Sequence, residues 1–341
     1  MYPGRADFEP HHSHLANFLW GSRAPELSQR LILGNGASEL IDILTRDAAA
    51  QGSPSAASPT QEPRSWCPGP SSTQYKEYSR SAHSAGFVEQ APGDDGASLV
   101  CIVNPSNPTG DYMPLADLQS WIEARVVQGR RKQQQRQQRQ QAAVHVLVDE
   151  SMLMWLGPAW SKSSLSSQQR WLEAMAADDV HIFTIHSWTK LWACPGLRLG
   201  SCVCPTDTAA SRIRSRQVPW SVNSPALAFL TAAVRDSRYL DRTWELTPEW
   251  NRAARDALRF AFPDWTVHGP PWASWLWVDT GSTDSLERAL ALARSVGLPI
   301  RSGAAGYDSP TCFRMAVRSP EISRALVDAL GSGSDSVMPP C

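Results

Sequence analysis

Short apolar runs alternate with amphipathic stretches along this chain, and the alternation predicts strands joined by helices. The strand-like runs are rich in Val, Ile and Leu and span residues 99–103, 145–148, 181–185 and 199–203. Between them, apolar positions recur every three or four residues, as in 39–46 and 115–125, and that spacing is helical. Strands that alternate with helices favour a mostly parallel sheet covered by helices on both faces.

The last third of the chain has a different order of elements. A mostly helical stretch covers residues 225–262, and the segments after it predict two strands and two helices, at 274–278, 285–296, 313–317 and 320–330. We therefore predict a large α/β domain over 1–222, an interdomain helix and small C-terminal α+β domain over 223–332, and a loose tail over 333–341.

Two segments of the large domain are expected to be insertions. Residues near 48–65 are rich in Ala, Ser, Pro and Gln, and residues near 128–143 hold a Gln/Arg tract. Neither segment has enough large apolar side chains to bury a core of its own. The tract either extends a helix into water or binds an acidic partner, and the solvated helix is the commoner case.

Composition narrows the function classes. The chain has 341 residues and a net charge of −1, so no global field draws it to nucleic acid or to a membrane surface. Its seven cysteines contain no Cys-x-x-Cys pair, which favours buried thiols over a disulfide framework or metal site. No apolar run reaches about 18 residues, and no hydrophobic signal core is present. We expect a cytoplasmic protein, or an organellar one if an N-terminal segment has been lost.

The segment from Ser187 to Gly200 carries the clearest chemistry. It places Lys190 among hydroxyl residues directly after an apolar run, with Arg198 eight positions later. An amine beside hydroxyl donors and a fixed cation suits a phosphorylated aldehyde such as pyridoxal phosphate. Taken alone, the same lysine is also compatible with a solvated side chain near the start of a helix.

Five segments in the same order resemble the fold-type-I pyridoxal-phosphate enzymes of the aspartate aminotransferase superfamily. Within it, the chain looks closest to the branch of histidinol-phosphate aminotransferase and threonine-phosphate decarboxylase. The segments are a Gly-rich turn, an Asn-Pro-x-Asn-Pro-Thr-Gly turn, a strand ending in Asp-Glu, the lysine segment and an arginine strand, at 33–40, 104–110, 146–150, 187–200 and 313–318. The resemblance implies the aminotransferase fold and pyridoxal 5'-phosphate as the cofactor.

The resemblance also implies which residues hold the cofactor's reactive group and its phosphate. Lys190 is expected to be catalytic, as the amine that joins the cofactor and moves the proton at the substrate α-carbon. Arg198 is expected to pair with the phosphate. Further donors to that phosphate are expected from the start of a helix and from hydroxyl groups, at Ala37, Ser38, Ser187 and Thr189.

Other residues are expected at the cofactor ring. Asp149 would pair with the pyridine nitrogen, although a helix cap is its plain alternative. Asn107 would donate to the 3-oxygen, and Tyr75 would stack on the ring. Tyr78 is a weaker alternative for the stacking ring, because residues 71–74 disturb the usual spacing.

Two arginines are candidates for the substrate. Arg314 is expected to grip the α-carboxylate. Arg318, an even number of residues further along the expected strand, would touch either a distal phosphate or carboxylate or only solvent.

Three features depart from the family pattern. Met152 stands where members usually carry Tyr or Phe, and the N-terminal arm that precedes the family's Tyr-Pro is missing. Tyr2 and Pro3 resemble that Tyr-Pro, whose tyrosine reaches the cofactor phosphate of a neighbouring subunit. This resemblance implies a homodimer with shared sites, and an ordinary N-terminal segment is the alternative.

The expected function is an aminotransferase that moves an amino group between an amino acid, or an amino-acid-like phosphate, and a 2-oxo acid. A decarboxylase of a phosphorylated amino acid is the alternative, because the same cofactor serves both reactions and substrate posture decides between them. A cofactor-binding pseudoenzyme is the third hypothesis, motivated by Met152, the missing arm and the Gln/Arg tract. The expected partners are small molecules and a second copy of the chain, with no nucleic acid and no membrane.

Overall fold

A computed structural model describes residues 5–51, 64–70, 75–94, 96–129 and 143–332 of the chain. It separates two compact units. We call residues 1–105, 113–154 and 158–237 the large unit, and residues 106–112, 155–157 and 238–341 the small unit. Among the described residues, no helix is long and apolar enough to cross a membrane.

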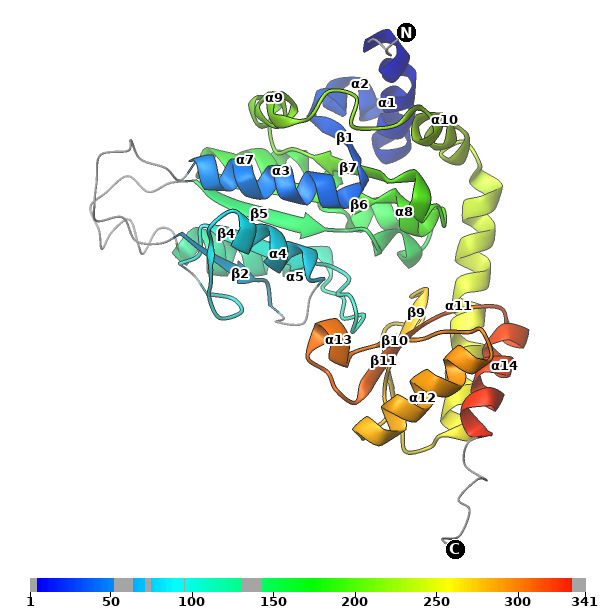
Figure 1. The fold of residues 1–341 in the computed structure, drawn as a ribbon. Helices are drawn as coiled ribbons and strands as arrows, with labels where there is room; N and C mark the ends of the chain where they lie inside the picture. Colours follow the sequence, from blue (N-terminus) through cyan, green and yellow to red (C-terminus); the bar gives the residue numbers. More distant parts are fainter. Residues whose placement is uncertain (1–4, 52–63, 71–74, 95, 130–142, 333–341) are drawn as a thin grey trace, which may run out of the picture. The chain divides into compact units, whose positions relative to one another are not determined.

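Within the described residues, the large unit contains one seven-stranded sheet in the order β1-β7-β6-β5-β4-β2-β3 (Figure 1). Its strands are β1 (Leu31–Asn35), β2 (Ser65–Pro68), β3 (Val88–Glu89), β4 (Leu99–Val103), β5 (Val144–Asp149), β6 (Val180–Ser187) and β7 (Leu199–Val203). Neighbours from β3 through β6 pair in parallel, and β7 runs antiparallel to both β6 and β1. The predicted α/β fold with a mostly parallel sheet is confirmed.

Helices surround this sheet. The large unit includes the α-helices α1 (Arg5–Trp20), α2 (Ala24–Leu27), α3 (Gly36–Gln51), α4 (Glu77–Ser84), α5 (Leu115–Ile122), α7 (Gln169–Ala177), α8 (Trp188–Leu191), α9 (Asp207–Arg216) and α10 (Ser224–Ala233). Shorter turns are η1 (Gly21–Arg23), η2 (Ser28–Arg30), η3 (Glu123–Val127, a π-helix), η4 (Leu153–Leu156), η5 (Trp160–Ser163), η6 (Leu165–Ser167) and η7 (Pro195–Leu197). The helix predicted at 115–125 thus includes a π-helical segment, after which residues 128 and 129 are again α-helical.

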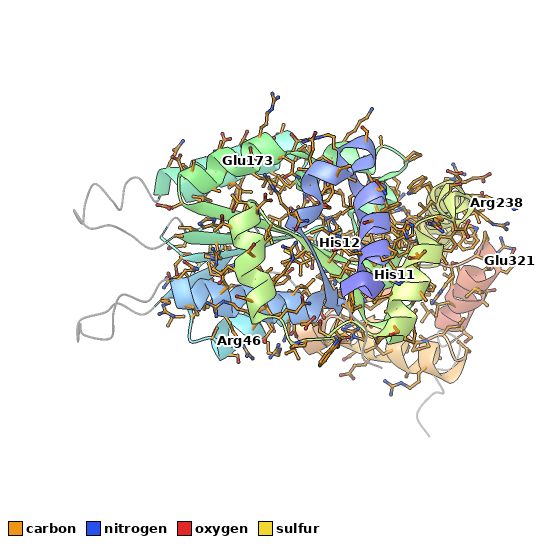
Figure 2. The ribbon with its side chains drawn as sticks, turned by 90° about the horizontal axis from the view of Figure 1, so that it is seen from above. His11, His12, Arg46, Glu173, Arg238 and Glu321 are labelled. Atoms are coloured by element: carbon orange, nitrogen blue, oxygen red, sulfur yellow. The ribbon has the colours of Figure 1, made fainter. Side chains whose placement is uncertain are left out.

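The alternation of side chains along the strands divides the core into two layers. Leu99 and Cys101 of β4 pack with α3, α4 and α9, whereas Val100 and Ile102 pack on the opposite face with α5 and α7. Both faces bury apolar side chains because successive residues of a strand point to opposite sides. In Figure 2, Arg46 on α3 and Glu173 on α7 lie on opposite sides of the sheet.

The described part of the small unit holds a four-stranded antiparallel sheet in the order β10-β11-β9-β8. Its elements are α11 (Ser237–Ala261), β8 (Thr266–His268), β9 (Trp275–Asp279), α12 (Thr283–Ser295), β10 (Arg301–Ser302), α13 (Ala304–Tyr307), β11 (Cys312–Ala316) and α14 (Pro320–Gly331). One face of the sheet packs against α11, α12 and α14. The other face carries Trp277, Tyr307 and Arg314.

Most of the two predicted insertions and the tail lies outside the described residues. Helix α3 continues to Gln51 and strand β2 begins at Ser65, so the ends of the first predicted insertion belong to regular elements.

Candidate functional site

Lys190 lies at the edge of the large unit's sheet where its parallel strands end. Strand β5 ends at Asp149, and its parallel neighbour β6 ends at Ser187. The short helix α8 follows at once and carries Lys190, whose side chain is exposed. Ligands of open α/β sheets bind at this edge, so the lysine and the aspartate are placed where a ligand is expected.

Arg198 lies against the start of α3. Its backbone is left-handed, with φ 56°, and a Cβ atom on Gly36 would come within 2.6 Å of its Nη2 atom. Gly36 has φ +76°, a conformation that glycine adopts without strain. The guanidinium therefore occupies space that only a glycine leaves open, beside the first amide groups of α3.

A second glycine brings β7 against the same turn. A Cβ atom on Gly200 would lie 2.5 Å from the backbone nitrogen of Ala37. The backbone of β7 therefore packs directly on the first residues of α3. The first amide groups of a helix have no partners within the helix, and its dipole adds positive potential. Arg198 and this helix start together make an anion-binding cradle.

Hydroxyl groups lie near the cradle, because Ser187 is the register partner of Gly200. Ser187 Oγ and Thr189 Oγ1 lie 2.9 Å apart, and the side chain of Tyr75 forms a hydrogen bond with Ser38. Burial raises the pKa of Tyr75, while the hydrogen bond with Ser38 and the charge of Arg198 oppose that shift. Tyr75 therefore lies close to the cradle, although the residue is 38% exposed.

Asp149 is held from two sides. Its Oδ1 atom accepts a hydrogen bond of 2.8 Å from the Ser151 amide, and its Oδ2 atom accepts one of 3.0 Å from the Tyr78 hydroxyl. Burial, followed by the charge of Asp149, raises the pKa of Tyr78 well above its usual value. The sequence pattern suggested Tyr78 only as an alternative stacking ring, and its contact with Asp149 could not be predicted because the two residues are 71 positions apart.

Ser151 and Glu150 join the ends of neighbouring elements. Ser151 Oγ accepts a hydrogen bond of 2.7 Å from the Ser187 amide, which ties the loop after β5 to the end of β6. Glu150 is buried and accepts hydrogen bonds from the Leu165 amide, at 2.8 Å, and from the Ser164 hydroxyl. None of these three contacts is visible in the sequence, because each joins residues that are 14 or more positions apart.

The small unit gathers a second set of polar groups. Asn107 Oδ1 accepts a hydrogen bond of 2.6 Å from Arg314 and a longer one, 3.4 Å, from the Tyr307 hydroxyl. The Trp275 indole donates to the Pro108 carbonyl at 2.7 Å and so anchors the turn that carries Asn107. Burial lowers the pKa of Arg314.

Arg301 of β10 is paired with Arg314 across the small sheet. Like charges directly opposite one another destabilise a sheet, so this pair is suited to an anion. The sequence gives no sign of the pairing, since it depends on strand register. Arg318 is exposed and lies beyond β11, which ends at Ala316. Arg318 therefore lies two residues past the strand that carries Arg314.

The predicted site residues divide between the two units. The large unit contains Ala37, Ser38, Tyr75, Asp149, Ser187, Thr189, Lys190 and Arg198. The small unit contains Asn107, Arg314 and Arg318. Tyr2 lies outside the described residues. Met152, at the position where a phenyl or phenol ring was expected, is half-buried in the large unit.

A model of the family "Aminotransferase class I and II" matches residues 135–330 of the chain. The chain belongs to this family. The family uses pyridoxal 5'-phosphate, which confirms the cofactor expected from the lysine segment. The matched region includes Asp149, Lys190, Arg198 and Arg314.

Two curated relatives illustrate the similarity. Threonine-phosphate decarboxylase from Salmonella typhimurium is 36% identical over 165 residues, which cover 48% of this chain and 44% of that protein. Histidinol-phosphate aminotransferase 1 from Dechloromonas aromatica is 24% identical over 307 residues, covering 88% of this chain and 75% of the relative. The first match thus spans less than half of the relative's length.

Solved structures share the fold. The histidinol-phosphate aminotransferase from Clostridium acetobutylicum has a TM-score of 0.72 at 18% identity, covering 99% of this chain and 91% of that one. The L-threonine-O-3-phosphate decarboxylase from Porphyromonas gingivalis has a TM-score of 0.67 at 14% identity, with 98% and 97% coverage. At this identity the likeness shows the fold alone.

The large unit's site fits the cofactor of the family. A phosphate dianion requires a cation and free amide donors, which Arg198 and the start of α3 provide around the space left by Gly36. A protonated pyridine nitrogen requires an oriented carboxylate, and Asp149 has both of its oxygens held. Lys190 belongs to the same unit.

Proposed function

We propose that this protein is a pyridoxal-phosphate-dependent aminotransferase that uses Lys190 as its catalytic amine. Its substrates would be an amino acid, or an amino-acid-like phosphate, and a 2-oxo acid. The observation that carries the proposal is the guanidinium of Arg198 seated over Gly36 at the start of α3. This cradle lies in the same unit as Lys190 and Asp149.

In this proposal, the phosphate of the cofactor would be held by a cation, by backbone amides and by hydroxyl donors. Arg198 supplies the cation, and the amides at Ala37 and Ser38 supply donors at the positive end of the α3 dipole. Ser187 and Thr189, whose hydroxyl groups already contact one another, add donors on the side of β6. Such an arrangement fixes one end of the ligand and leaves Lys190 to meet its aldehyde.

Asp149 of the large unit would pair with the nitrogen of the cofactor ring, and the family resemblance assigns the 3-oxygen to Asn107 of the small unit. The bound cofactor supplies an electron sink for the carbanion formed at the substrate α-carbon. Lys190 would carry the proton between that carbon and the cofactor. Because Arg314 and Tyr307 both donate to Asn107 Oδ1, the amide of Asn107 keeps its NH₂ group for the 3-oxygen.

The substrate would be held by arginines of the small unit. Arg314 is the expected partner of the α-carboxylate, which every amino-acid substrate carries. Arg301, paired with it across the sheet, is suited to a second anionic group such as a phosphate. Arg318 remains a weaker candidate for such a group.

A decarboxylase of a phosphorylated amino acid is the second candidate. The observation that favours it is the 36% identity to a threonine-phosphate decarboxylase over 165 residues. The bond held perpendicular to the cofactor ring is the one that breaks, so the posture of the substrate decides between the two reactions.

The absorbance spectrum of the protein with pyridoxal phosphate, before and after borohydride reduction, tests cofactor attachment. Reduction should leave the chromophore on the peptide that contains Lys190, and Lys190→Ala should abolish it. Product analysis then separates the reactions, because an aminotransferase yields pyridoxamine phosphate and a decarboxylase releases carbon dioxide. A spectrum without turnover on any amino acid would instead support a pseudoenzyme.

The homodimer forms a separate part of the proposal. Tyr2 would reach the phosphate site of a second copy, so each site would need both chains. Sedimentation would give the assembly state. Mixing Tyr2→Phe chains with Lys190→Ala chains would restore activity only in mixed dimers that contain one intact shared site.

A further inference from the structure

Tyr78 belongs to α4, three positions after Tyr75, and both hydroxyl groups contact candidate site residues. Tyr75 forms its hydrogen bond with Ser38, beside the phosphate cradle. Tyr78 donates to Asp149 at 3.0 Å. The two rings meet edge to face, with centroids 6.5 Å apart and planes at 80°. The segment from Tyr75 into the first turn of α4 therefore contacts the residues proposed for both ends of one ligand.

The contact between Tyr78 and Asp149 is almost entirely shielded from water. Tyr78 is 1% exposed and Asp149 is 7% exposed. A hydrogen bond to a carboxylate is stronger in such surroundings than at the surface. Since the Ser151 amide engages the other oxygen, the plane of the carboxylate is fixed by donors on both sides. A carboxylate offers about four acceptor positions, so capacity for a third donor remains.

Packing alone would also give a buried tyrosine a polar partner. A Tyr78 hydroxyl that only stabilises the fold and one that orients Asp149 differ in their effect on ligand affinity. If the hydroxyl only stabilises the fold, its loss changes the affinity for every ligand of the site alike. If the hydroxyl orients Asp149, its loss weakens only ligands that carry a protonated ring nitrogen.

We propose that Tyr78 is a positioning residue, which holds the carboxylate of Asp149 in the orientation that pairs with the ring nitrogen of the cofactor. Tyr75 acts at the other end of the ligand through Ser38. This inference rests on the proposed function, because it assumes that the large unit's site binds pyridoxal phosphate.

The experiment compares two ligands on three proteins. The ligands are pyridoxal phosphate and its carbocyclic analogue, in which a carbon atom replaces the ring nitrogen. The proteins are the parent chain, Tyr78→Phe and the matched variant Tyr75→Phe. Dissociation constants are measured by quenching of tryptophan fluorescence, a readout that does not depend on turnover.

Tyr78→Phe should raise the dissociation constant of pyridoxal phosphate about tenfold, because it removes one hydrogen bond to a charged acceptor. The dissociation constant of the analogue should change by less than about twofold. Tyr75→Phe should weaken both ligands by the same factor, since the phosphate is common to them. Equal changes for both ligands in Tyr78→Phe, no change, or tighter binding of pyridoxal phosphate would overturn the proposal.

A second variant addresses folding. Tyr78→His keeps a ring and an N–H donor, and it should restore part of the preference for the ring nitrogen that Tyr78→Phe loses. If neither variant folds, the hydroxyl serves the fold and the proposal is wrong. If the parent chain binds the analogue and pyridoxal phosphate with equal affinity, the ring nitrogen contributes nothing to binding. The role proposed for Tyr78 is then wrong, although the proposed cofactor stands. If the parent binds neither ligand, the proposed function itself fails.

Discussion

Replacing Gly36 by alanine should separate cofactor binding from folding. The Cβ atom of Gly36→Ala would lie 2.6 Å from Nη2 of Arg198, and ordinary contact begins at 3.4 Å. The guanidinium must therefore move by about 0.8 Å to relieve the overlap. Such a shift removes its alignment with a phosphate, which we expect to cost about 1.5–3 kcal/mol, or roughly 10- to 100-fold in affinity.

The backbone makes a separate contribution. Gly36 has φ +76°, and placing an L-residue in that region costs about 1–2 kcal/mol of stability. Gly86 has a similar φ of +83°, but nothing lies within 4 Å of a Cβ atom placed there. Gly86→Ala is thus a matched control that carries the strain without the overlap.

Urea unfolding of the cofactor-free proteins gives the stability loss, and titration with pyridoxal phosphate gives the affinity. Both variants should lose about 1–2 kcal/mol of stability, and only Gly36→Ala should lose affinity. If Gly36→Ala bound pyridoxal phosphate as tightly as Gly86→Ala, Arg198 would not hold the phosphate from this position.

Three further predictions concern stability and substrate binding. Asp47 is fully buried between Arg212, Arg216 and His145, so Asp47→Asn should destabilise the protein by about 3 kcal/mol in urea unfolding. Asp42→Asn, which breaks a partly exposed pair with Arg46, should cost under about 0.5 kcal/mol, and equal losses would contradict the difference in burial. Burial, reinforced by the charges of His145 and Arg212, lowers the pKa of His181 from 6.5 to about 4. The unfolded chain therefore takes up this proton first, so stability should fall as the pH drops from 6.5 towards 4, and His181→Asn should flatten that slope. Arg314→Gln should raise KM for the amino acid about 100-fold with cofactor affinity unchanged, and an unchanged KM would remove Arg314 from the substrate site.

Asp47 also contributes to the pH dependence of stability, in a pH range that follows from the direction of its pKa shift. Burial alone would raise the pKa of Asp47, but the hydrogen bond from His145 and the charge of Arg212 outweigh it and lower that pKa. The stabilisation from Asp47 is therefore present above pH 3.8, its ordinary pKa, and is lost as the pH falls below that value. Asp47 and His181 thus act in different pH ranges, although both lie in the large unit.

Strands were predictable where apolar residues are continuous. Strands β4 and β7 begin and end where the apolar runs placed them, at Leu99–Val103 and Leu199–Val203. These strands are covered on both faces, so every position is apolar or small and the run itself marks the element. Strand β10 is two residues long and includes Arg301, and no apolar pattern distinguishes so short a segment from a loop.

The motifs placed the candidate chemistry on the correct local elements. Gly36 begins α3, Asp149 ends β5, and Lys190 follows β6. These positions depend on short stretches of sequence, because turns and strand ends are set by local residues. The partners of those groups were not predictable in the same way. Tyr78 meets Asp149 from 71 residues away in sequence, and Arg314 meets Asn107 from 207 residues away.

The sequence by itself determined the family, its cofactor, and the α/β architecture, because motif order and hydrophobic periodicity are properties of the linear chain. Only the tertiary structure decided that Arg198 fills the space beside Gly36, that Tyr78 rather than solvent engages Asp149, and that Arg318 lies beyond its strand. Those facts depend on strand register and on which side chains reach the same point from distant segments. Neither is encoded by spacing along one segment, since a shift of one residue in register sends each side chain to the opposite face.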